Sequence, residues 1–361
     1  MQPLPQSIAD ILELARWAPS GDNTQPWRFE VIDSHHVRVY ACDTRDHCVY
    51  DLDGHASQMA WGALLETMRI AATAAGWSMV CERSSASLES QAEFDVFFQP
   101  ETGIKPDPLW LHIPARSVQR RPLSAQPLTT AEKIALEAAA APFGLVWHEG
   151  LSGRWAIARL LFTSAKIRLI SPEAYQVHKS IIDWNRRYSE DRVPDQAIGL
   201  DPLTLKLMAW VMQRWQRVEF FNAYLMGTLA PRLQLDLIPA LACAAHFRLV
   251  AGHLPTVADD YIAAGRSLQR VWLTATRLGL MMQPEMTPLI FTRYAREHRT
   301  FTENRQALGL ANRVRSQLDA LWGAHAPASL FLGRIGRGPA PTARSLRKSL
   351  ASLLQPVRRL R

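Results

Sequence analysis

The chain has 361 residues, 48% of them hydrophobic and 20% charged, a balance that indicates a folded globular protein and excludes an intrinsically disordered one. Its 41 Lys and Arg against 33 Asp and Glu give a formal net charge of +8. No basic stripe with a known nucleic-acid-binding motif accompanies that charge, so we expect no nucleic-acid partner. No apolar run approaches the roughly 18 residues of a membrane-spanning helix, so we expect no transmembrane segment.

The four cysteines show no spacing typical of metal ligands, which predicts free thiols and no metal site. They are Cys42, Cys48, Cys81 and Cys243. Free thiols are typical of reducing compartments, and the N-terminus shows no charged-then-apolar leader pattern. We therefore predict a cytoplasmic protein.

Hydrophobic periodicity predicts a first group of elements before residue 108. In chain order these are helix 7–18, a strand pair over 28–40, helix 58–75, and strands 77–81 and 94–98. Ser7 is a plausible N-cap of the first helix, and Gly76 ends the second. Residues 99–108 are rich in Pro and Gly and form a predicted linker.

A second group of elements follows the linker. In chain order these are helix 130–140, strand 144–148, helix 154–170, helices near 202–216 and 218–228, strand 244–251, helix 257–279 and strand 328–335. Thr129 or Thr130 caps the first of these helices, and Gly279 ends the last. A turn at residues 336–339 follows the final strand.

Helix and strand signals alternate in both groups, which predicts the α+β class. The order helix, loop, strand pair, helix, strand occurs twice, so we expect two related halves, residues 1–108 and 109–361. The aromatic-rich residues 183–232 form a predicted helical insertion in the second half. We favour packing of its helices on the body of the protein. A lid over a site, or an apolar face for a partner or a membrane, are the alternatives.

Two loops carry residue types suited to ligand binding. Residues 18–27 place two prolines, a glycine and short polar side chains between a helix and a strand, which suits either a structural turn or a loop that presents backbone amides to a ligand. Residues 116–121 carry three arginines shortly before a helix. Arginine binds phosphate bidentately, so this segment is either a phosphate site or a solvated charged turn.

Two later segments complete the candidate set. A long helix ends at Gly279 and passes into an apolar stretch that ends in Gln283 and Pro284, where the backbone could lie flat against a ring system. The final strand leads through a Gly/Pro turn to Arg344. Taken singly, each segment is equally compatible with an ordinary connection on the surface.

Taken together, these segments resemble the nitroreductase-like FMN flavoproteins, and the loop from Pro19 to Trp27 is similar to that family's signature. The resemblance implies an FMN site with the arginine segment on the cofactor, Gln283-Pro284 against the isoalloxazine and Arg344 at the phosphate. The implied FMN-binding residues are Pro19, Ser20, Asn23, Arg116, Ser117, Arg120, Gln283, Pro284 and Arg344. Ser117 stands in for a serine or threonine that the family carries elsewhere in its arginine motif.

The order of the motifs is informative, because the Pro-Ser loop precedes the arginine segment by about ninety residues here, whereas it follows that motif in the usual family member. This order resembles the Acg-like branch, in which two halves are fused in one chain. The second half has no Pro-Ser loop of its own, so the resemblance implies one FMN site in a pseudo-dimeric monomer or in a homodimer.

The resemblance implies an FMN-dependent oxidoreductase that transfers hydride to or from a small conjugated organic substrate, with NADH or NADPH as its usual donor. A flavin-sequestering protein without turnover is the alternative, and a basic binding module without flavin is a third hypothesis. The catalytic residues are unknown from sequence. No side chain needs to act as a general acid, and no histidine shows a recognisable pairing with a carboxylate.

Overall fold

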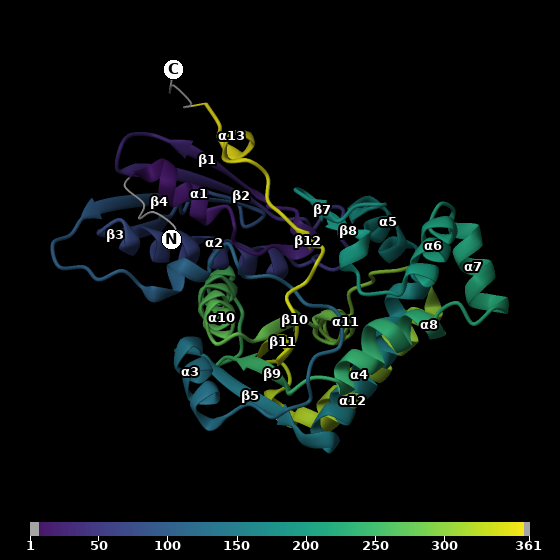
Figure 1. Ribbon diagram of the computed structural model, residues 1–361. Coiled ribbons are helices and arrows are strands. Elements are labelled where there is room, and N and C mark those ends of the chain that lie inside the picture. Colours follow the sequence, from purple (N-terminus) through teal and green to yellow (C-terminus); the bar gives the residue numbers. More distant parts are fainter. Residues whose placement is uncertain (1–6, 357–361) are drawn as a thin grey trace.

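The computed structural model describes residues 7–356 and contains two four-stranded antiparallel sheets, each with helices packed against it (Figure 1). The first sheet consists of β1 (Trp27–Val31), β2 (His36–Cys42), β3 (Trp77–Arg83) and β4 (Gln91–Pro100). The second consists of β5 (Gly144–Glu149), β9 (Ala245–Val250), β10 (Met281–Pro284) and β11 (Ser329–Gly336). The predicted α+β class is confirmed.

The two sheets share one strand order, β1-β2-β4-β3 in the first and β5-β9-β11-β10 in the second. In each sheet a long helix connects the second strand to the third: α2 (His55–Ala74) in the first and α10 (Ala258–Arg277) in the second. The second unit differs by two insertions, one between β5 and β9 and one between β10 and β11. The repeated order is what two related halves predict.

The insertions and flanks supply the remaining helices. The α-helices are α1 (Ile8–Ala15), α3 (Thr130–Ala140), α4 (Gly150–Ile170), α5 (Pro172–Ile181), α6 (Pro202–Val211), α7 (Trp215–Tyr224), α8 (Leu229–Pro231), α9 (Ile238–Leu241), α11 (Thr287–Arg296), α12 (Arg305–Trp322) and α13 (Leu350–Leu353). The predicted caps Ser7 and Thr129 both form, and Thr129 belongs to a capping box with Glu132. The sequence pattern did not predict α5, α11 or α12.

Helices α2 and α10 lie against each other between the two sheets, and their backbones touch. A Cβ on Gly62 would lie 1.9 Å from the carbonyl oxygen of Ile262, and a Cβ on Gly265 would lie 2.0 Å from that of Met59. Each glycine stands seven residues after the first residue of a 20-residue helix. The contact is therefore reciprocal, and both glycines are required by the close approach of the helices rather than by backbone conformation.

Two segments of chain cross between the sheets. Beyond β4, a 3-10 turn (Pro108–His112) leads to Gln119, whose backbone N–H donates to the carbonyl of Met282 in β10 at 3.0 Å. From the other direction, β12 (Arg344–Ser345) and α13 lead to Gln355, whose N–H donates to the carbonyl of Phe29 in β1 at 2.8 Å. Figure 1 shows this C-terminal segment crossing the molecule in yellow.

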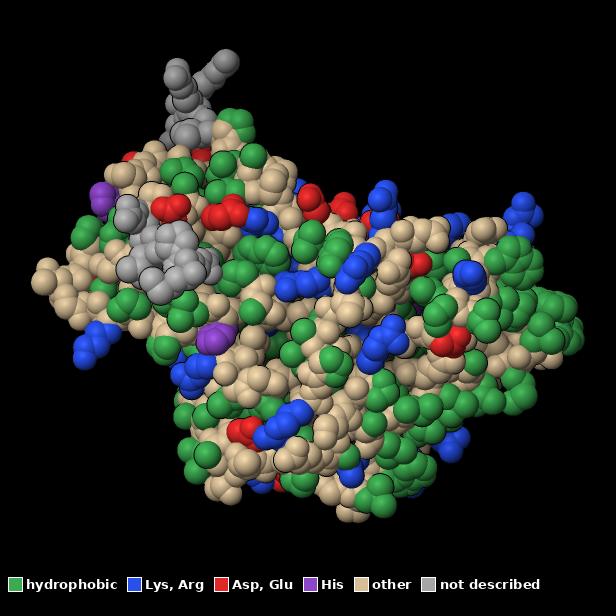
Figure 2. Space-filling view, viewed as in Figure 1, with side chains coloured by type: hydrophobic (Ala, Val, Ile, Leu, Met, Phe, Trp, Pro, Cys, Tyr) green, Lys and Arg blue, Asp and Glu red, His purple; other side chains and the backbone are tan. Residues whose placement is uncertain are grey.

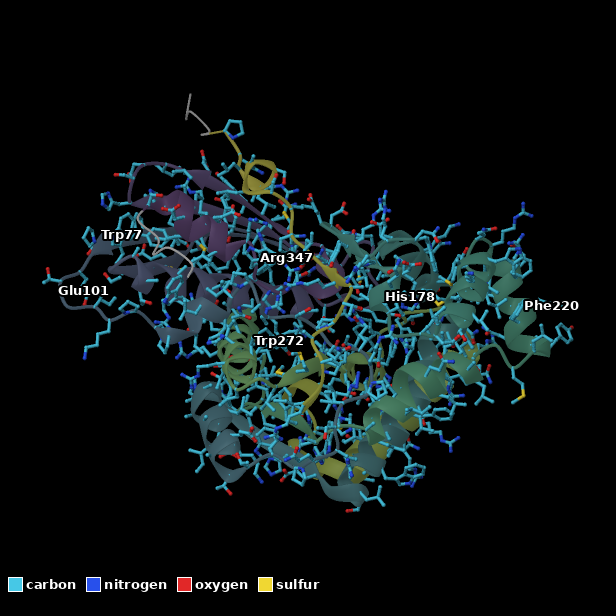
Figure 3. The ribbon with its side chains drawn as sticks, viewed as in Figure 1. Trp77, Glu101, His178, Phe220, Trp272 and Arg347 are labelled. Carbon is cyan, nitrogen blue, oxygen red and sulfur yellow. The ribbon has the colours of Figure 1, made fainter. Side chains whose placement is uncertain are left out.

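The aromatic-rich insertion divides into two parts. Short strands β7 (Tyr188–Ser189) and β8 (Val193–Pro194) lie beside β12, and β6 (Ile182–Asp183) pairs with β8. Helices α6 and α7 contain no fully buried residue. Both helices still contact the body: Leu205 and Met208 of α6 pack against a small apolar cluster, and Asn222 of α7 donates to the carbonyl of Leu169 at 2.8 Å. Their large apolar side chains gather at one end of the molecule (Figure 2), with Leu203 79% and Tyr224 75% exposed, and Phe220 lies at the same far end (Figure 3).

No helix between residues 7 and 356 is long and apolar enough to cross a membrane.

We predict that Gly62→Ala and Gly265→Ala each destabilise the protein by about 1–3 kcal/mol or more, because the added methyl group must push two buried helix backbones apart. Urea unfolding followed by circular dichroism measures the change. Gly309→Ala in α12 is the matched control: its Cβ meets nothing within 4 Å, so the helix should gain about 0.5–1 kcal/mol. Equal effects at all three positions would contradict the close contact.

Candidate functional site

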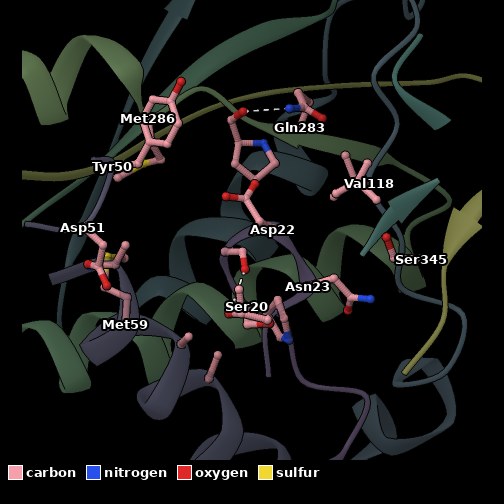
Figure 4. A pocket seen from close by; sticks show the side chains of 18 of the residues that line it. Ser20, Asp22, Asn23, Tyr50, Asp51, Met59, Val118, Gln283, Met286 and Ser345 are labelled. Carbon is pink, nitrogen blue, oxygen red and sulfur yellow. Dashed lines mark hydrogen bonds between the residues drawn. The ribbon is translucent and has the colours of Figure 1, made fainter. Parts of the chain in front are cut away.

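All nine residues that the resemblance implies for FMN line one cavity of about 380 Å³ between the two halves (Figure 4). Its volume lies within the ~300–1,000 Å³ typical of small-molecule sites. The walls come from the 19–26 loop, the N-terminal part of α2, residues 116–120, α10, β10 and the C-terminal residues 343–347. Residues separated by more than three hundred positions therefore meet here, because each half extends over the other.

The loop after α1 is held in an unusual backbone conformation. Asp22, Asn23 and Gln25 all have positive φ, at 50°, 64° and 50°. Non-glycine residues seldom adopt this region, and clusters of such residues mark functional sites whose strain the surrounding structure must stabilise. The conformation therefore depends on the contacts that hold the loop.

Those contacts come from the insertion and from the loop itself. The Asn23 side-chain amide donates to the carbonyls of Glu190 and Arg192 at 3.1 and 3.2 Å, and the Gln25 amide donates to the carbonyl of Glu190 at 2.8 Å. The Ser20 hydroxyl accepts from the backbone N–H of Gln25 at 3.0 Å. The signature residues thus fix the loop and tie it to the second half.

One end of the cavity holds a cluster of three arginines: Arg116, Arg344 and Arg347. Arg347 donates to the carbonyl of Ala18 at 3.0 Å and to Oδ1 of Asn23 at 2.8 Å. Arg116 and Arg344 donate to backbone carbonyls at 3.1 and 2.9 Å. Across residues 7–356, none of the three forms an ion pair with a carboxylate. The sequence analysis did not identify Arg347.

Aromatic rings contact two arginines of this cluster. The Arg116 guanidinium lies 4.6 Å from the centroid of Trp272 in α10, and the Arg344 guanidinium lies 5.3 Å from that of Trp17. These cation–π contacts stabilise the charge of each arginine without neutralising it. Figure 3 shows Trp272 and Arg347 near the middle of the molecule, between the two halves.

The charges of this arginine cluster are not compensated by the protein. Burial lowers the pKa of Arg116 well below its usual range, and the nearby Arg347 and Arg344 lower it further. Burial, Arg344 and Arg16 lower the pKa of Arg347 to about 9. The Nε atoms of Arg116 and Arg344 are buried without a hydrogen-bond partner. Buried cations with free donors require an anion, and a phosphate group fits this donor set.

The remaining predicted residues lie beyond the arginine cluster. Arg120 donates to the carbonyl of Ala197 at 3.2 Å; burial lowers its pKa, and nearby Asp22 opposes that effect. Gln283 donates to the carbonyl of Pro284 at 2.9 Å, while its Oε1 is buried without a partner. Ser117 lines the cavity. Arg120 therefore stands apart from the other arginines, on the side of Asp22.

A buried charged triad supports the wall formed by Pro284. His246 Nδ1 lies 2.7 Å from Glu285 Oε2, and its Nε2 lies 2.9 Å from the carbonyl oxygen of Ala240. Arg334 Nε lies 3.4 Å from Glu285 Oε1, and Arg334 donates to the carbonyl of Arg120 at 2.7 Å. The expectation that no histidine pairs with a carboxylate is wrong, because residues far apart in the sequence form this pair.

The opposite end of the cavity is built partly from the insertions. The Tyr50 hydroxyl and His178 Nε2 lie 2.9 Å apart, and one nitrogen of Arg168, Nη2, donates to both carboxylate oxygens of Asp236 at 2.9 and 2.6 Å. Burial and the nearby Arg168 lower the pKa of His178 to about 3, so this histidine is neutral. The sequence analysis did not identify these residues, because they belong to elements outside the signature segments.

The nitroreductase family model matches residues 3–60, which include the whole strained loop. The chain is similar to nitroreductases in this region, and the similarity supports an oxidoreductase activity. Two proteins of Mycobacterium tuberculosis, from strains CDC 1551 and H37Rv, each named "Putative NAD(P)H nitroreductase", are 28% identical to it over 294 residues. The matched region spans 79% of this chain and 77% of each relative.

We predict that the His246 triad makes stability depend on pH. Burial alone would lower the pKa of His246, but Glu285 and Cys243 raise it to about 10, above its unfolded value of 6.5. The contribution of protonated His246 to the stability of the folded protein is therefore complete below about pH 6.5, and it is lost as the pH rises through about 10. His246→Gln should lower the melting temperature at pH 6.5 and flatten its decline toward pH 10.

His253→Gln is the control, because the side chain of His253 is 70% exposed on the surface. Thermal unfolding of both variants and the native protein across this pH range isolates the contribution of His246. Parallel curves for the His246 variant and the native protein would show that the triad carries no such linkage.

Proposed function

We propose that the protein is an FMN-dependent oxidoreductase that transfers hydride through bound FMN to or from a small conjugated organic substrate. The observation that carries this proposal is the cluster of Arg116, Arg344 and Arg347, which is buried, free of carboxylate partners and placed at one end of the cavity. A phosphate dianion would satisfy the two unpartnered Nε atoms and restore the pKa of each guanidinium.

The remaining cavity residues suit the rest of such a cofactor. Gln283 and Pro284 form one wall and the strained loop forms another, so a flat ring would be held between segments that belong to different halves. Arg120 would supply a cation beside the ring. When bound, FMN supplies the hydride chemistry, and the protein supplies orientation, electrostatics and exclusion of water.

The proposal includes the arrangement of the chain. We propose that residues 1–108 and 109–361 act as the two halves of a pseudo-dimer that resembles the Acg-like branch and holds one FMN. The shared strand order and the reciprocal contact of α2 with α10 support it. The same proposal includes NADH or NADPH as the electron donor. It also includes a cytoplasmic location and a monomeric or homodimeric protein.

We further propose that the part of the 183–232 insertion nearest the cavity closes the site. Carbonyls of Glu190 and Arg192 hold the strained loop, and Val193 and Ala197 line the cavity. Helices α6 and α7 lie outside this contact region, because neither contributes a residue to the cavity wall. A lid role therefore suits residues 188–198 better than the two aromatic helices.

We predict that the double variant Arg116→Ala, Arg344→Ala folds but is mostly colourless as purified. Each lost charge-assisted hydrogen bond is worth about 1.5–3 kcal/mol, so FMN affinity should fall by roughly 10²–10⁴-fold. Absorbance at the flavin bands and fluorescence titration with FMN measure the loss, and circular dichroism checks the fold.

The matched control is Arg305→Ala, Arg313→Ala, which removes two exposed arginines of α12 and the same net charge. It should retain FMN. Stoichiometric flavin in the Arg116, Arg344 double variant would show that the cofactor phosphate does not lie at this cluster. A native protein without any flavin affinity would refute the proposed function.

A flavin-sequestering protein without turnover is the second candidate, and the hydrogen bonds that bind the loop to Glu190 and Arg192 favour it, since they help to enclose the cavity. Mixing the FMN-loaded protein with NADH or NADPH in a stopped-flow spectrometer separates the two functions. We expect bleaching of the flavin absorbance within seconds. Absence of bleaching with either nicotinamide would favour sequestration.

A further inference from the structure

Asp22 is the one of the three positive-φ residues of the strained loop whose side chain makes no hydrogen bond within the described residues, whereas Asn23 and Gln25 both make them. It lies between Ser20 and Asn23, and both of these residues form hydrogen bonds. Those hydrogen bonds hold the backbone of Asp22 at its φ of 50°. Figure 4 shows its carboxyl among the side chains that line the cavity, with Gln283 on one side and Ser20 and Asn23 on the other.

Two carboxyls line the cavity, and they differ in how they are bonded. Asp51 accepts hydrogen bonds from the hydroxyls of Thr44 and Ser57 at 2.8 and 2.6 Å and from the backbone N–H of Ala56 at 2.8 Å, so it caps α2. Asp22 forms no hydrogen bond and no ion pair through its carboxyl with any residue in the described range 7–356. A polar group directed into a cavity without a protein partner is available to a ligand.

The groups that face Asp22 come from two segments. Arg120 provides a positive charge, and Asp51, Cys48 and Tyr50 stand on the loop before α2. Burial raises the pKa of the Asp22 carboxyl; Arg120 lowers it, and Asp51 raises it. Burial raises the pKa of Cys48 to about 12 and that of Tyr50 further, so both remain protonated near neutral pH.

We propose that Asp22 is a catalytic general acid that protonates an oxygen of a conjugated carbonyl or nitro acceptor while that acceptor is reduced in this cavity. This inference rests on the proposed function, because it requires FMN as the hydride source. It also defines the substrate class: the acceptor must carry an oxygen on which negative charge develops within reach of the Asp22 carboxyl.

The step balances in electrons and atoms. Bound, reduced FMN would supply a hydride, that is, two electrons and one hydrogen, to the conjugated acceptor and would itself be oxidised. The O–H bond of Asp22 breaks as an O–H bond forms on the acceptor oxygen, which neutralises the charge that the hydride delivered. The Asp22 carboxylate then takes a proton from water before the next turnover.

Asp22→Asn tests the proposal, because asparagine tolerates positive φ and keeps the shape of the side chain but has no acidic proton. Asp46→Asn is the matched control, because Asp46 is exposed and its substitution removes the same charge. The FMN-loaded proteins are reduced with dithionite, which avoids dependence on a nicotinamide, and then mixed with p-benzoquinone in a stopped-flow spectrometer.

We expect Asp22→Asn to retain FMN and to slow flavin reoxidation by about 10²–10⁴-fold, the usual contribution of a general acid. The native rate should fall as the pH rises and Asp22 loses its proton, and the variant rate should not depend on pH. Reoxidation of Asp22→Asn at the native rate, with native pH dependence, would overturn the proposal. A native protein that binds no FMN would instead overturn the proposed function.

Infrared spectroscopy of the flavin-free protein provides a test without turnover. The carbonyl stretch of a protonated carboxyl should persist above the usual aspartic acid pKa of roughly 3.9 in the native protein and in Asp46→Asn. This band should be weaker in Asp22→Asn; burial also raises the pKa values of Asp51 and Asp236, which account for any remaining intensity. An unchanged band in Asp22→Asn would assign the persistent proton to another group and contradict the proposal.

Discussion

The contact between the backbones of α2 and α10 is the constraint on which the rest of the structure depends. Gly62 and Gly265 let the two helices approach so closely that a Cβ at either position would lie 1.9 or 2.0 Å from a backbone carbonyl oxygen of the other helix. Met59 and Trp272, on the same two helices, line the cavity. The helix pair therefore fixes the distance between the sheets, and with it the width of the site that the two halves enclose.

Local patterns explain which parts of this arrangement the sequence could predict. Some features are encoded within a few neighbouring residues, so they could be predicted. These are the caps Ser7 and Thr129, the alternating strands of the first half and the loop that begins at Pro19. Helices α11 and α12 were not predicted, although both have clear apolar faces.

The site residues that the sequence could not reveal depend on contacts between distant segments. Arg347 stands three residues beyond the predicted Arg344, and its bonds to Ala18 and Asn23, which no sequence pattern reveals, place it in the site. His246 and Glu285 lie 39 residues apart in the chain and meet because β9 and β10 both pair with β11. Such pairings follow from sheet topology, which single-residue patterns do not specify.

The strained loop and the buried arginines form one coupled unit. Asn23 accepts from Arg347, and Gln25 accepts from the backbone N–H of Lys348, so the same C-terminal segment that brings Arg344 to the cavity also holds the positive φ angles of the loop. An anion at the arginine cluster would stabilise that segment and, through it, the conformation of Asp22. Cofactor binding and placement of the proposed acid are therefore physically linked, since both depend on the path of residues 344–348.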